Sequence, residues 1–463
     1  MNGYLTSTQS VCGVCRRPLP AQIFVESGAV RMRKHCPEHG PQERLISTDA
    51  EAYVRLPRFH RRAWKPRQFA TEARGCPDSC GICPEHEQHV CLPIIEITDH
   101  CNWECPICLV RNPGRRHLTR AEVATMLDRL LAAEGRIDIL NLSGGEPTLN
   151  PYFRDIVEEC VGRKDILRVS VSTNGSVLAR DSALLRFLAE RRVIVSLQFD
   201  GLDDSIYQAL RGRPLLAEKL RLIDQCGELD ASMSLTTTVA RGINAEASAL
   251  APIADLLFQH HHIVSAMFQP ATYTGNARNF PRPANPVTAP DVIAALRGAG
   301  GGTVAPADFS PLPCSHPACF SLAFYLQTGP GRHQPIKQLV GAERFLDLVS
   351  NRALFGTDEG SYACIADAVY DLWSGPAALS PDSEAALRTV RRLLLAAAPA
   401  GAYSPQGAVA VAERSVKSIF IHQFMDPDSF DLSRARKCCQ VYPQPDGRDL
   451  PVCIRNCLGE EGP

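Results

Sequence analysis

Between residues 93 and 285, short apolar runs rich in β-branched residues alternate with stretches whose apolar positions recur at helical spacing. The first pattern predicts buried strands and the second predicts amphipathic helices. Repeated strand–helix units favour an α/β fold with a parallel sheet, right-handed crossovers and chemistry at the carboxyl ends of the strands. The predicted strands are residues 94–98, 137–142, 168–173, 193–199, 233–239 and 264–269, and the predicted helices are residues 119–133, 152–162, 182–190, 216–227 and 247–259.

The chain on either side of this region has a different composition. Residues 275–313 are rich in Pro, Gly and Ala, which predicts a long connection with one short helix near residues 291–297. We predict three parts: a cysteine-rich N-terminal module (residues 1–90), a strand–helix domain (residues 91–285) and a C-terminal helical module (residues 286–463). The helices predicted in the last part are residues 341–351, 363–373 and 381–397.

Charge and hydropathy exclude several classes of function. A net charge of −1 offers no basic face to nucleic acid and no polybasic patch to a membrane. The longest apolar run, residues 393–402, is broken by Pro399 and is too short to span a bilayer. No charged segment followed by an apolar one opens the chain, so we expect no signal peptide. Nineteen cysteines then indicate metal ligands rather than disulfides, which predicts a cytoplasmic protein.

Cys101, Cys105 and Cys108 are the cysteines with the most informative surroundings. They have the spacing C-x3-C-x2-C and come directly after the first predicted strand. Three thiolates can hold three irons of a 4Fe–4S cluster and leave the fourth iron open to a small molecule. The alternative is a closed zinc or electron-transfer site, for which His100 or His117 could supply the fourth ligand.

A second triad, Cys76, Cys80 and Cys83, has the same spacing but follows no predicted strand. We therefore expect it to hold an auxiliary cluster, with Cys91 as a further candidate ligand. The alternative ligands for this site are His86 and His89.

The remaining cysteines fall into three sets. Two knuckles near the N-terminus predict a mononuclear zinc or iron site. Cysteines near the C-terminus are numerous enough for a second auxiliary cluster, and those inside apolar helical patterns are expected to be buried small residues. The N-terminal set is Cys12, Cys15, Cys36 and His39; the C-terminal set is Cys314, Cys319, Cys438, Cys439, Cys453 and Cys457; the helical set is Cys160, Cys226 and Cys364.

Gly144 and Gly145 lie in the segment LSGGEP at the end of the second predicted strand, where the absence of side chains allows close approach of backbone to a ligand. The cysteine triad, this turn and the six strand–helix units together resemble the radical S-adenosylmethionine (SAM) enzymes. The resemblance implies a partial (β/α)6 barrel of TIM type whose open iron binds SAM. It also implies that the turn faces the amino group of SAM, and we expect Glu146 to hold the turn by accepting hydrogen bonds.

Polar side chains at the ends of later strands are implied to contact SAM or the substrate by the same resemblance. Arg211 is similar to an arginine that meets the SAM carboxylate, and a surface role is its alternative. Ile107 stands where many members have an aromatic residue, so adenine is expected to rest on it or on Trp103. The full set of expected contacts is Thr173, Asn174, Ser196, Gln198, Asp200, Arg211 and Gln269.

The ordered cysteine motifs narrow the resemblance further. CxxC…CPEHG, GCPxxCGxCPEHxQ, TDHCNxxCPxC and the tail FMDPDSFDLSRARKCC…PDGRDLPVC are similar to the tetraether lipid synthase group, whose relatives are often labelled dihydropterin methyltransferases. This implies a radical cluster, two auxiliary 4Fe–4S clusters and one rubredoxin-like mononuclear metal. Arg455 departs from the tyrosine of the archaeal pattern, which leaves the substrate open.

The function implied by this resemblance is reductive cleavage of SAM to a 5′-deoxyadenosyl radical, which abstracts hydrogen from an unactivated carbon so that lipid alkyl chains couple. The implied partners are a flavodoxin- or ferredoxin-type reductant and a lipid, with peripheral membrane contact. Three alternatives stay open: methyl transfer to a pterin or another heterocycle, modification of a peptide, and a non-catalytic iron–sulfur electron carrier.

Overall fold

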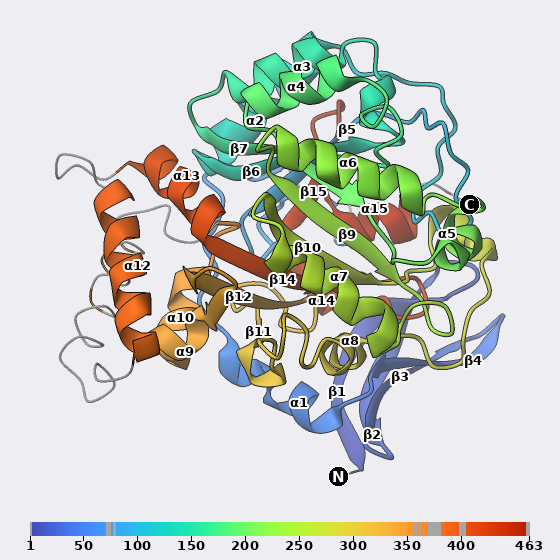
Figure 1. The fold of residues 1–463 in the computed structure, drawn as a ribbon. Helices are drawn as coiled ribbons and strands as arrows, with labels where there is room; N and C mark the ends of the chain where they lie inside the picture. Colours follow the sequence, from blue (N-terminus) through green and yellow to red (C-terminus); the bar gives the residue numbers. More distant parts are fainter. Residues whose placement is uncertain are drawn as a thin grey trace.

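The six predicted strands form the centre of a large sheet in the computed structural model (Figure 1). They lie in chain order and each neighbouring pair is parallel. The structure describes residues 2–70, 76, 80–354, 381–397 and 404–459, with the single positions 360, 363, 365 and 367. The strands are β5 (Leu92–Thr98), β6 (Ile137–Gly144), β7 (Ile166–Thr173), β8 (Ile194–Gln198), β9 (Met233–Val239) and β10 (Ile263–Pro270).

Helices cover one face of this sheet and bury the main core (Figure 1). Ile95 and Ile97 of β5 pack in that core with Val123, while the residues between them point to the opposite, inner face. Cys160 and Cys226 are fully buried in the same core, as predicted. The helices are α2 (Arg120–Glu134), α3 (Phe153–Val161), α4 (Ser182–Glu190), α5 (Asp204–Arg211), α6 (Leu216–Glu228) and α7 (Ala247–Gln259).

The C-terminal part extends the sheet at both sides, which the sequence prediction missed. β14 (Val416–His422) pairs parallel with β10, and β12 (Phe320–Gly329) pairs antiparallel with β14. On the other side, β15 (Gln440–Pro443) pairs parallel with β5 and antiparallel with β16 (Asp449–Pro451). β12, β14 and β15 are separated along the chain from β10 and β5 by long segments, and β15 and β16 have only four and three residues, so no local strand–helix repeat marks them.

The C-terminal helices largely follow the prediction. α12 (Pro381–Ala397) has the predicted bounds, α10 (Ala342–Val349) and α8 (Ala289–Ala295) lie within or near the predicted ranges, and the predicted helix at residues 363–373 falls mostly outside the described residues. No described helix is both long and apolar enough to cross a bilayer. The other elements are β11 (Ser310–Pro311), β13 (Arg332–Pro335), α9 (Ile336–Val340), α13 (Pro405–Ser415), α14 (Leu432–Arg436) and α15 (Val452–Leu458).

A separate antiparallel sheet forms the N-terminal module. Its strands are β1 (Gly3–Val11), β2 (Pro18–Glu26), β3 (Ala29–Cys36) and β4 (Gly40–Ser47), followed by α1 (Ala50–Arg55). Alternate side chains of β2 and β3 are buried, among them Ile23 and Met32, so this sheet has one apolar and one solvent-facing side.

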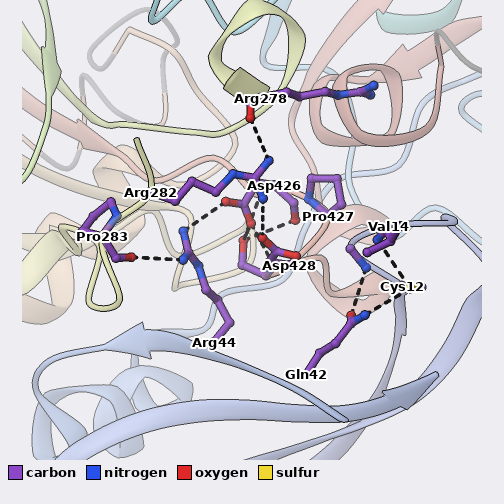
Figure 2. A network of polar contacts seen from close by, with 12 residues as sticks. Cys12, Val14, Gln42, Arg44, Arg278, Arg282, Pro283, Asp426, Pro427 and Asp428 are labelled. Carbon is purple, nitrogen blue, oxygen red and sulfur yellow. Dashed lines mark hydrogen bonds and ion pairs between the residues drawn. The ribbon is translucent and has the colours of Figure 1, made fainter. Parts of the chain in front are cut away.

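Ion pairs and carbonyl contacts fasten this module to the C-terminal tail (Figure 2). Arg44 of β4 pairs with Asp426 at 3.3 Å, and Arg282 pairs with Asp428 at 2.8 Å. The buried Lys34 ammonium donates to the carbonyl oxygens of Pro427 and Asp428 at 2.8 and 2.9 Å. Burial lowers the pKa of Lys34 to about 8 although both aspartates oppose the shift. The N-terminal sheet is therefore held against the segment that leads to the last cysteines.

Candidate functional site

The loop between β5 and α2 carries Cys101, Cys105 and Cys108 at the carboxyl end of the sheet. All three are partly buried, and burial together with the nearby thiols raises the pKa of Cys101 to about 11. The Trp103 amide N–H points at Cys101 Sγ at 3.4 Å, a donor that stabilises a thiolate. Three soft ligands in one loop at the carboxyl end of a parallel sheet suit a cluster with one open iron.

The two histidines considered as alternative ligands differ in their surroundings. His117 Nδ1 lies 2.9 Å from Thr98 Oγ1, so this ring already has a partner in β5. The His100 ring faces that of His117 with the centroids 6.1 Å apart. The carbonyl oxygen of His100 accepts the Glu146 N–H at 2.8 Å, which ties the loop to the next strand.

Gly144 and Gly145 pack directly against the backbone of this cysteine loop. The Gly145 N–H donates to the Thr98 carbonyl oxygen at 2.8 Å. A Cβ on Gly144 would stand 2.0 Å from that oxygen, and a Cβ on Gly145 would stand 2.2 Å from the His100 carbonyl oxygen. The observed role of these glycines is therefore close packing against the cysteine loop, and their contact with SAM stays a prediction.

We expect Gly145→Ala to disturb the cysteine loop, because its methyl group would overlap backbone that cannot rotate away. The free energy of unfolding should fall by about 1–3 kcal/mol, and iron content after anaerobic reconstitution should fall with it. Gly329→Ala is the matched control, since the nearest atom to its Cβ is Arg332 Cδ at 4.0 Å. Equal iron content in the two variants would contradict the packing role.

Glu146 is fully buried and joins the ends of β6 and β7. Its carboxylate accepts hydrogen bonds from the Thr148 and Thr173 hydroxyls at 2.6 and 2.8 Å and from the Asn174 N–H at 2.7 Å. Burial raises its pKa although these donors oppose the shift. Thr173 and Asn174, predicted to contact SAM, are thus held by the residue predicted to hold the turn.

Asp200 and Arg211 form a buried, bidentate ion pair beside the cysteine loop. Arg211 Nε donates to one Asp200 oxygen at 2.7 Å and Nη2 donates to the other at 3.0 Å. Arg211 also donates to Thr238 Oγ1 at 3.0 Å. The surface alternative for Arg211 is wrong, because its side chain is 9% exposed. Its predicted contact with a SAM carboxylate is untested by this geometry.

Lys219 is a buried charged residue that the sequence reasoning missed. Its ammonium donates to the Asn174 carbonyl oxygen at 2.6 Å and to Gln198 Oε1 at 2.9 Å, and it lies 4.9 Å from the centre of the Trp103 ring. Burial lowers its pKa to about 7 although Asp200 opposes the shift. Its burial could have been predicted from its position in α6, since it lies three and four residues before the buried Leu222 and Ile223 and therefore on the same face of the helix.

The other predicted polar residues lie along the inner strand ends. Gln198 Nε2 donates to Asp200 at 2.5 Å, and the Ser196 hydroxyl lies 3.2 Å from Thr236 Oγ1. Gln269 Nε2 approaches the Met267 sulfur at 3.2 Å. Ile107 is buried among other aliphatic side chains, whereas the buried Trp103 packs with Cys101 and Cys105.

Cys12, Cys15, Cys36 and His39 form a compact group between the two hairpins of the N-terminal sheet. Their four candidate ligand atoms all lie within 4.8 Å of one another. Gln42 Nε2 donates to Cys12 Sγ at 3.1 Å, and its oxygen accepts the Gly13 N–H (Figure 2). Three sulfurs and one imidazole nitrogen at this spacing suit a tetrahedral structural zinc site.

Cys91, Cys314 and Cys439 lie together. This group combines a cysteine predicted beside the Cys76 triad with two cysteines of the predicted C-terminal set. Hydrogen bonds with Cys314 and Cys439, together with burial, raise the pKa of the Cys91 thiol well above its usual range. The sequence predicts Cys91 as a ligand beside the Cys76 triad, whereas the structure places it with Cys314 and Cys439. Cys91 directly precedes β5 and Cys439 directly precedes β15, and these two strands pair. The Cys91 N–H donates to the Cys439 carbonyl oxygen at 2.9 Å.

Further donors surround this three-cysteine group. The Asn351 N–H donates to Cys314 Sγ at 3.0 Å, and Gln88 Nε2 donates to Cys91 Sγ at 3.3 Å. His89 lies 3.5 Å from Cys91 Sγ but also lies 3.0 Å from Glu134, while His86 contacts the Cys438 carbonyl oxygen at 2.8 Å.

The other cysteines form a second group around Cys438. A hydrogen bond with Cys76 and burial raise the pKa of the Cys80 thiol, and Cys83 and Cys438 act in the same direction. Burial and the nearby thiols of Cys453, Cys439 and Cys319 raise the pKa of Cys438. Cys457 donates to the Met425 carbonyl oxygen at 3.2 Å. Cys364 falls outside the described residues.

Comparison with known protein families agrees with this geometry. The radical SAM superfamily model matches residues 95–250, and the HMPTM N-terminal zinc ribbon domain model matches residues 4–48. The protein is therefore a radical SAM enzyme with an N-terminal zinc ribbon, and a 4Fe–4S cluster and SAM are its cofactors. Enzymes of this class need an electron donor of the flavodoxin or ferredoxin kind.

A relative along the whole length is the 7,8-dihydro-6-hydroxymethylpterin dimethyltransferase of Methanocaldococcus jannaschii. It is 26% identical over 97% of this chain and 93% of its own length. The GTP 3′,8-cyclase of Acidothermus cellulolyticus is 30% identical, but over 32% of this chain and 43% of its own length. Lipid coupling, which the sequence resemblance implied, receives no support from these relatives.

Solved structures align with parts of the chain at low identity and low TM-score. A radical SAM methyltransferase from Sphaerobacter thermophilus covers 65% of this chain and 75% of its own, with a TM-score of 0.34 and 14% identity. Streptococcus suis SuiB bound to its precursor peptide SuiA covers 43% of each chain, with a TM-score of 0.38 and 13% identity.

Proposed function

We propose that this protein is a radical SAM methyltransferase that replaces C–H bonds of a pterin or closely related heterocycle with C–CH3 bonds. The whole-length alignment with the dihydropterin dimethyltransferase carries the proposal, because it spans 97% of this chain. It therefore includes the zinc ribbon and the cysteine-rich C-terminal tail as well as the radical SAM domain. A shared domain alone would support the class of chemistry and leave the substrate open.

Cys101, Cys105 and Cys108 are the proposed ligands of the radical cluster. These residues would hold the cluster, which when bound would supply the reductive cleavage of SAM and so the radical chemistry needed to remove hydrogen from an unactivated carbon. The donor set fits, since three partly buried thiols lie in one short loop, and the backbone of this loop leaves no room for a side chain at the glycine turn. Glu146 keeps the turn and the end of β7 in place through its three donors.

We also propose that the remaining cysteines hold the auxiliary clusters. Cys91, Cys314 and Cys439 would supply one site, where N–H groups from Gln88 and Asn351 stabilise the thiolates. Cys76, Cys80, Cys83 and Cys438 are the favoured ligands of another. The compact N-terminal group would hold zinc or iron, and its role is structural, because it joins two hairpins far from the cysteine loop along the chain.

The test is an anaerobic assay of the reconstituted full-length protein with a reductant, methyl-deuterated SAM and 7,8-dihydro-6-hydroxymethylpterin. We expect 5′-deoxyadenosine and a pterin that gains one or two methyl groups; deuterium in the product and matching S-adenosylhomocysteine would identify SAM as the methyl donor. A parallel reaction contains a lipid extract in place of the pterin. An unchanged pterin with 5′-deoxyadenosine that rises on adding lipid would overturn the substrate assignment. Intact clusters without 5′-deoxyadenosine would contradict radical chemistry.

A further inference from the structure

A cavity of about 160 Å³ lies inside the sheet, on the face away from the covering helices. It is at the level of the middle and amino-terminal halves of the strands, whereas the Cys101 loop is at their carboxyl ends. For scale, a cavity of about 150 Å³ holds a benzene ring. The space is therefore of the right order for a flat ring system.

One wall of the cavity is a ladder of small polar side chains. Consecutive strands β6 to β10 each contribute one small polar or amide residue: Asn141, Ser170, Ser196, Ser234 and Ser265. Ile139, Ile194 and Met267 of the same strands also line the cavity. Two neighbouring pairs of the ladder are hydrogen-bonded: Ser265 Oγ donates to Ser234 Oγ at 2.7 Å, and Asn141 Nδ2 donates to Ser170 Oγ at 2.8 Å. Interiors of such sheets are usually filled by bulky branched residues. Here each of the five strands also places a small polar or amide side chain at this level, and a cavity remains.

Much of the remaining lining is aromatic or aliphatic, and two cysteines belong to it. Phe320 and Phe324 come from β12, and Phe420 comes from β14, where it pairs with Met267 of β10. Cys91 and Cys439, two members of the proposed auxiliary site, also line it. A ligand here would lie between aromatic faces and hydroxyl groups, with the auxiliary site at its edge.

Gln440 lines the same cavity and has an unsatisfied acceptor. Its side chain is buried, with the residue 4% exposed, and its Oε1 has no hydrogen-bond partner among the described residues. A buried acceptor without a donor is costly, and native structures leave few of them. Gln440 is the first residue of β15 and pairs with Leu92 of β5, so its backbone is fixed beside Cys439. The missing partner is therefore a donor that enters the cavity.

We propose that this cavity binds the ring of the substrate, with Gln440 Oε1 accepting a hydrogen bond from a ring N–H or exocyclic amine. This inference rests on the proposed function and assigns the place where that substrate lies. A pterin offers N–H donors, a flat face for the phenylalanines and polar edges for the serine ladder, whereas an alkyl chain offers no donor. The ring would then lie between the SAM-binding mouth and the auxiliary cysteines.

The test measures binding of 7,8-dihydro-6-hydroxymethylpterin to the anaerobically reconstituted holoenzyme by equilibrium dialysis, with neither SAM nor reductant. Gln440→Met keeps side-chain length but removes the acceptor, and we expect Kd to rise at least about tenfold. Ser234→Val adds bulk to the serine ladder and should weaken binding by a similar factor or more. Gln444→Met is the matched control on the same segment, outside this cavity, and should leave Kd within about twofold.

Iron and sulfide content and the melting temperature of each variant are measured first, so that a folding defect is recognised. If Gln440→Met fails to fold, Ser234→Val alone decides the matter. Wild-type binding with unchanged Kd in the cavity variants, or with equal losses in Gln444→Met, would overturn the cavity assignment while the proposed function stands. Absence of binding and of methylation in the wild type would overturn both.

Discussion

Cys105→Ala is expected to abolish reductive cleavage of SAM. Cys105 is the middle cysteine of the triad that follows strand β5, in a loop that packs against the Gly144–Gly145 turn. With two thiolates left, the cluster would lose a protein ligand to one iron and would not assemble in its active form. Formation of 5′-deoxyadenosine should fall at least about a thousandfold, to the level of a reaction without protein, a loss above about 4 kcal/mol in barrier terms.

The measurement is 5′-deoxyadenosine formed under strong reductant, alongside the electron paramagnetic resonance signal of the reduced protein with and without SAM. Cys226→Ala is the matched control, since that thiol is fully buried in the helix-covered core. Cys80→Ala tests the competing triad, and we expect it to keep the SAM-dependent change in signal. If Cys105→Ala kept that change and Cys80→Ala lost it, the two triads would exchange roles.

Arg211→Met is expected to lower the free energy of unfolding by about 3–5 kcal/mol. Asp200 is fully buried, and Arg211 donates to both of its oxygens at 2.7 and 3.0 Å. Removing the guanidinium leaves a carboxylate that accepts hydrogen bonds from the Thr238 N–H and the Gln198 amide, with no opposing charge in direct contact among the described residues. Desolvation of an unpaired charge is the larger effect here, since exposed ion pairs contribute only about 0–1 kcal/mol.

Urea unfolding of the anaerobic holoenzyme gives the required free energies. Arg388→Met is the matched control, because its pair with Glu384 is exposed, and it should change stability by less than about 1 kcal/mol. A second variant, Arg211→Met with Asp200→Leu, removes both charges and should recover part of the loss. A double variant as unstable as the single one would show that the unpaired carboxylate is not the cause.

Local pattern was sufficient for the radical SAM strands and helices. Helix α7 and strand β9 begin and end at the predicted residues, and the other predicted elements lie within about two residues of their observed bounds. Each is a continuous run whose own periodicity reports its buried face, and so neighbours elsewhere in the chain are not needed to recognise it. Helix α5 was missed, because its eight residues follow a turn and carry a short apolar stripe.

The cysteine loop and its glycine turn were equally visible. The requirements on these residues act over a short stretch of chain. Three thiolates must reach one cluster, and two glycines must pack against a neighbouring backbone, so the sequence motif alone shows both. The partners of Glu146 were not visible, since Thr173 and Asn174 belong to the next strand and are brought to it by parallel pairing.

What the sequence determined by itself was therefore the class of the enzyme: the strand–helix repeat, the Cys101 triad, the turn at Gly144 and the zinc knuckles. Only the tertiary structure decided that Cys91 joins Cys314 and Cys439, that β14 and β15 extend the sheet, and that Gln440 lines a cavity walled by serines. The physical reason is the distance along the chain over which each feature is determined. Periodicity and ligand spacing are properties of adjacent residues, whereas these groupings depend on the register between strands that are distant in the chain.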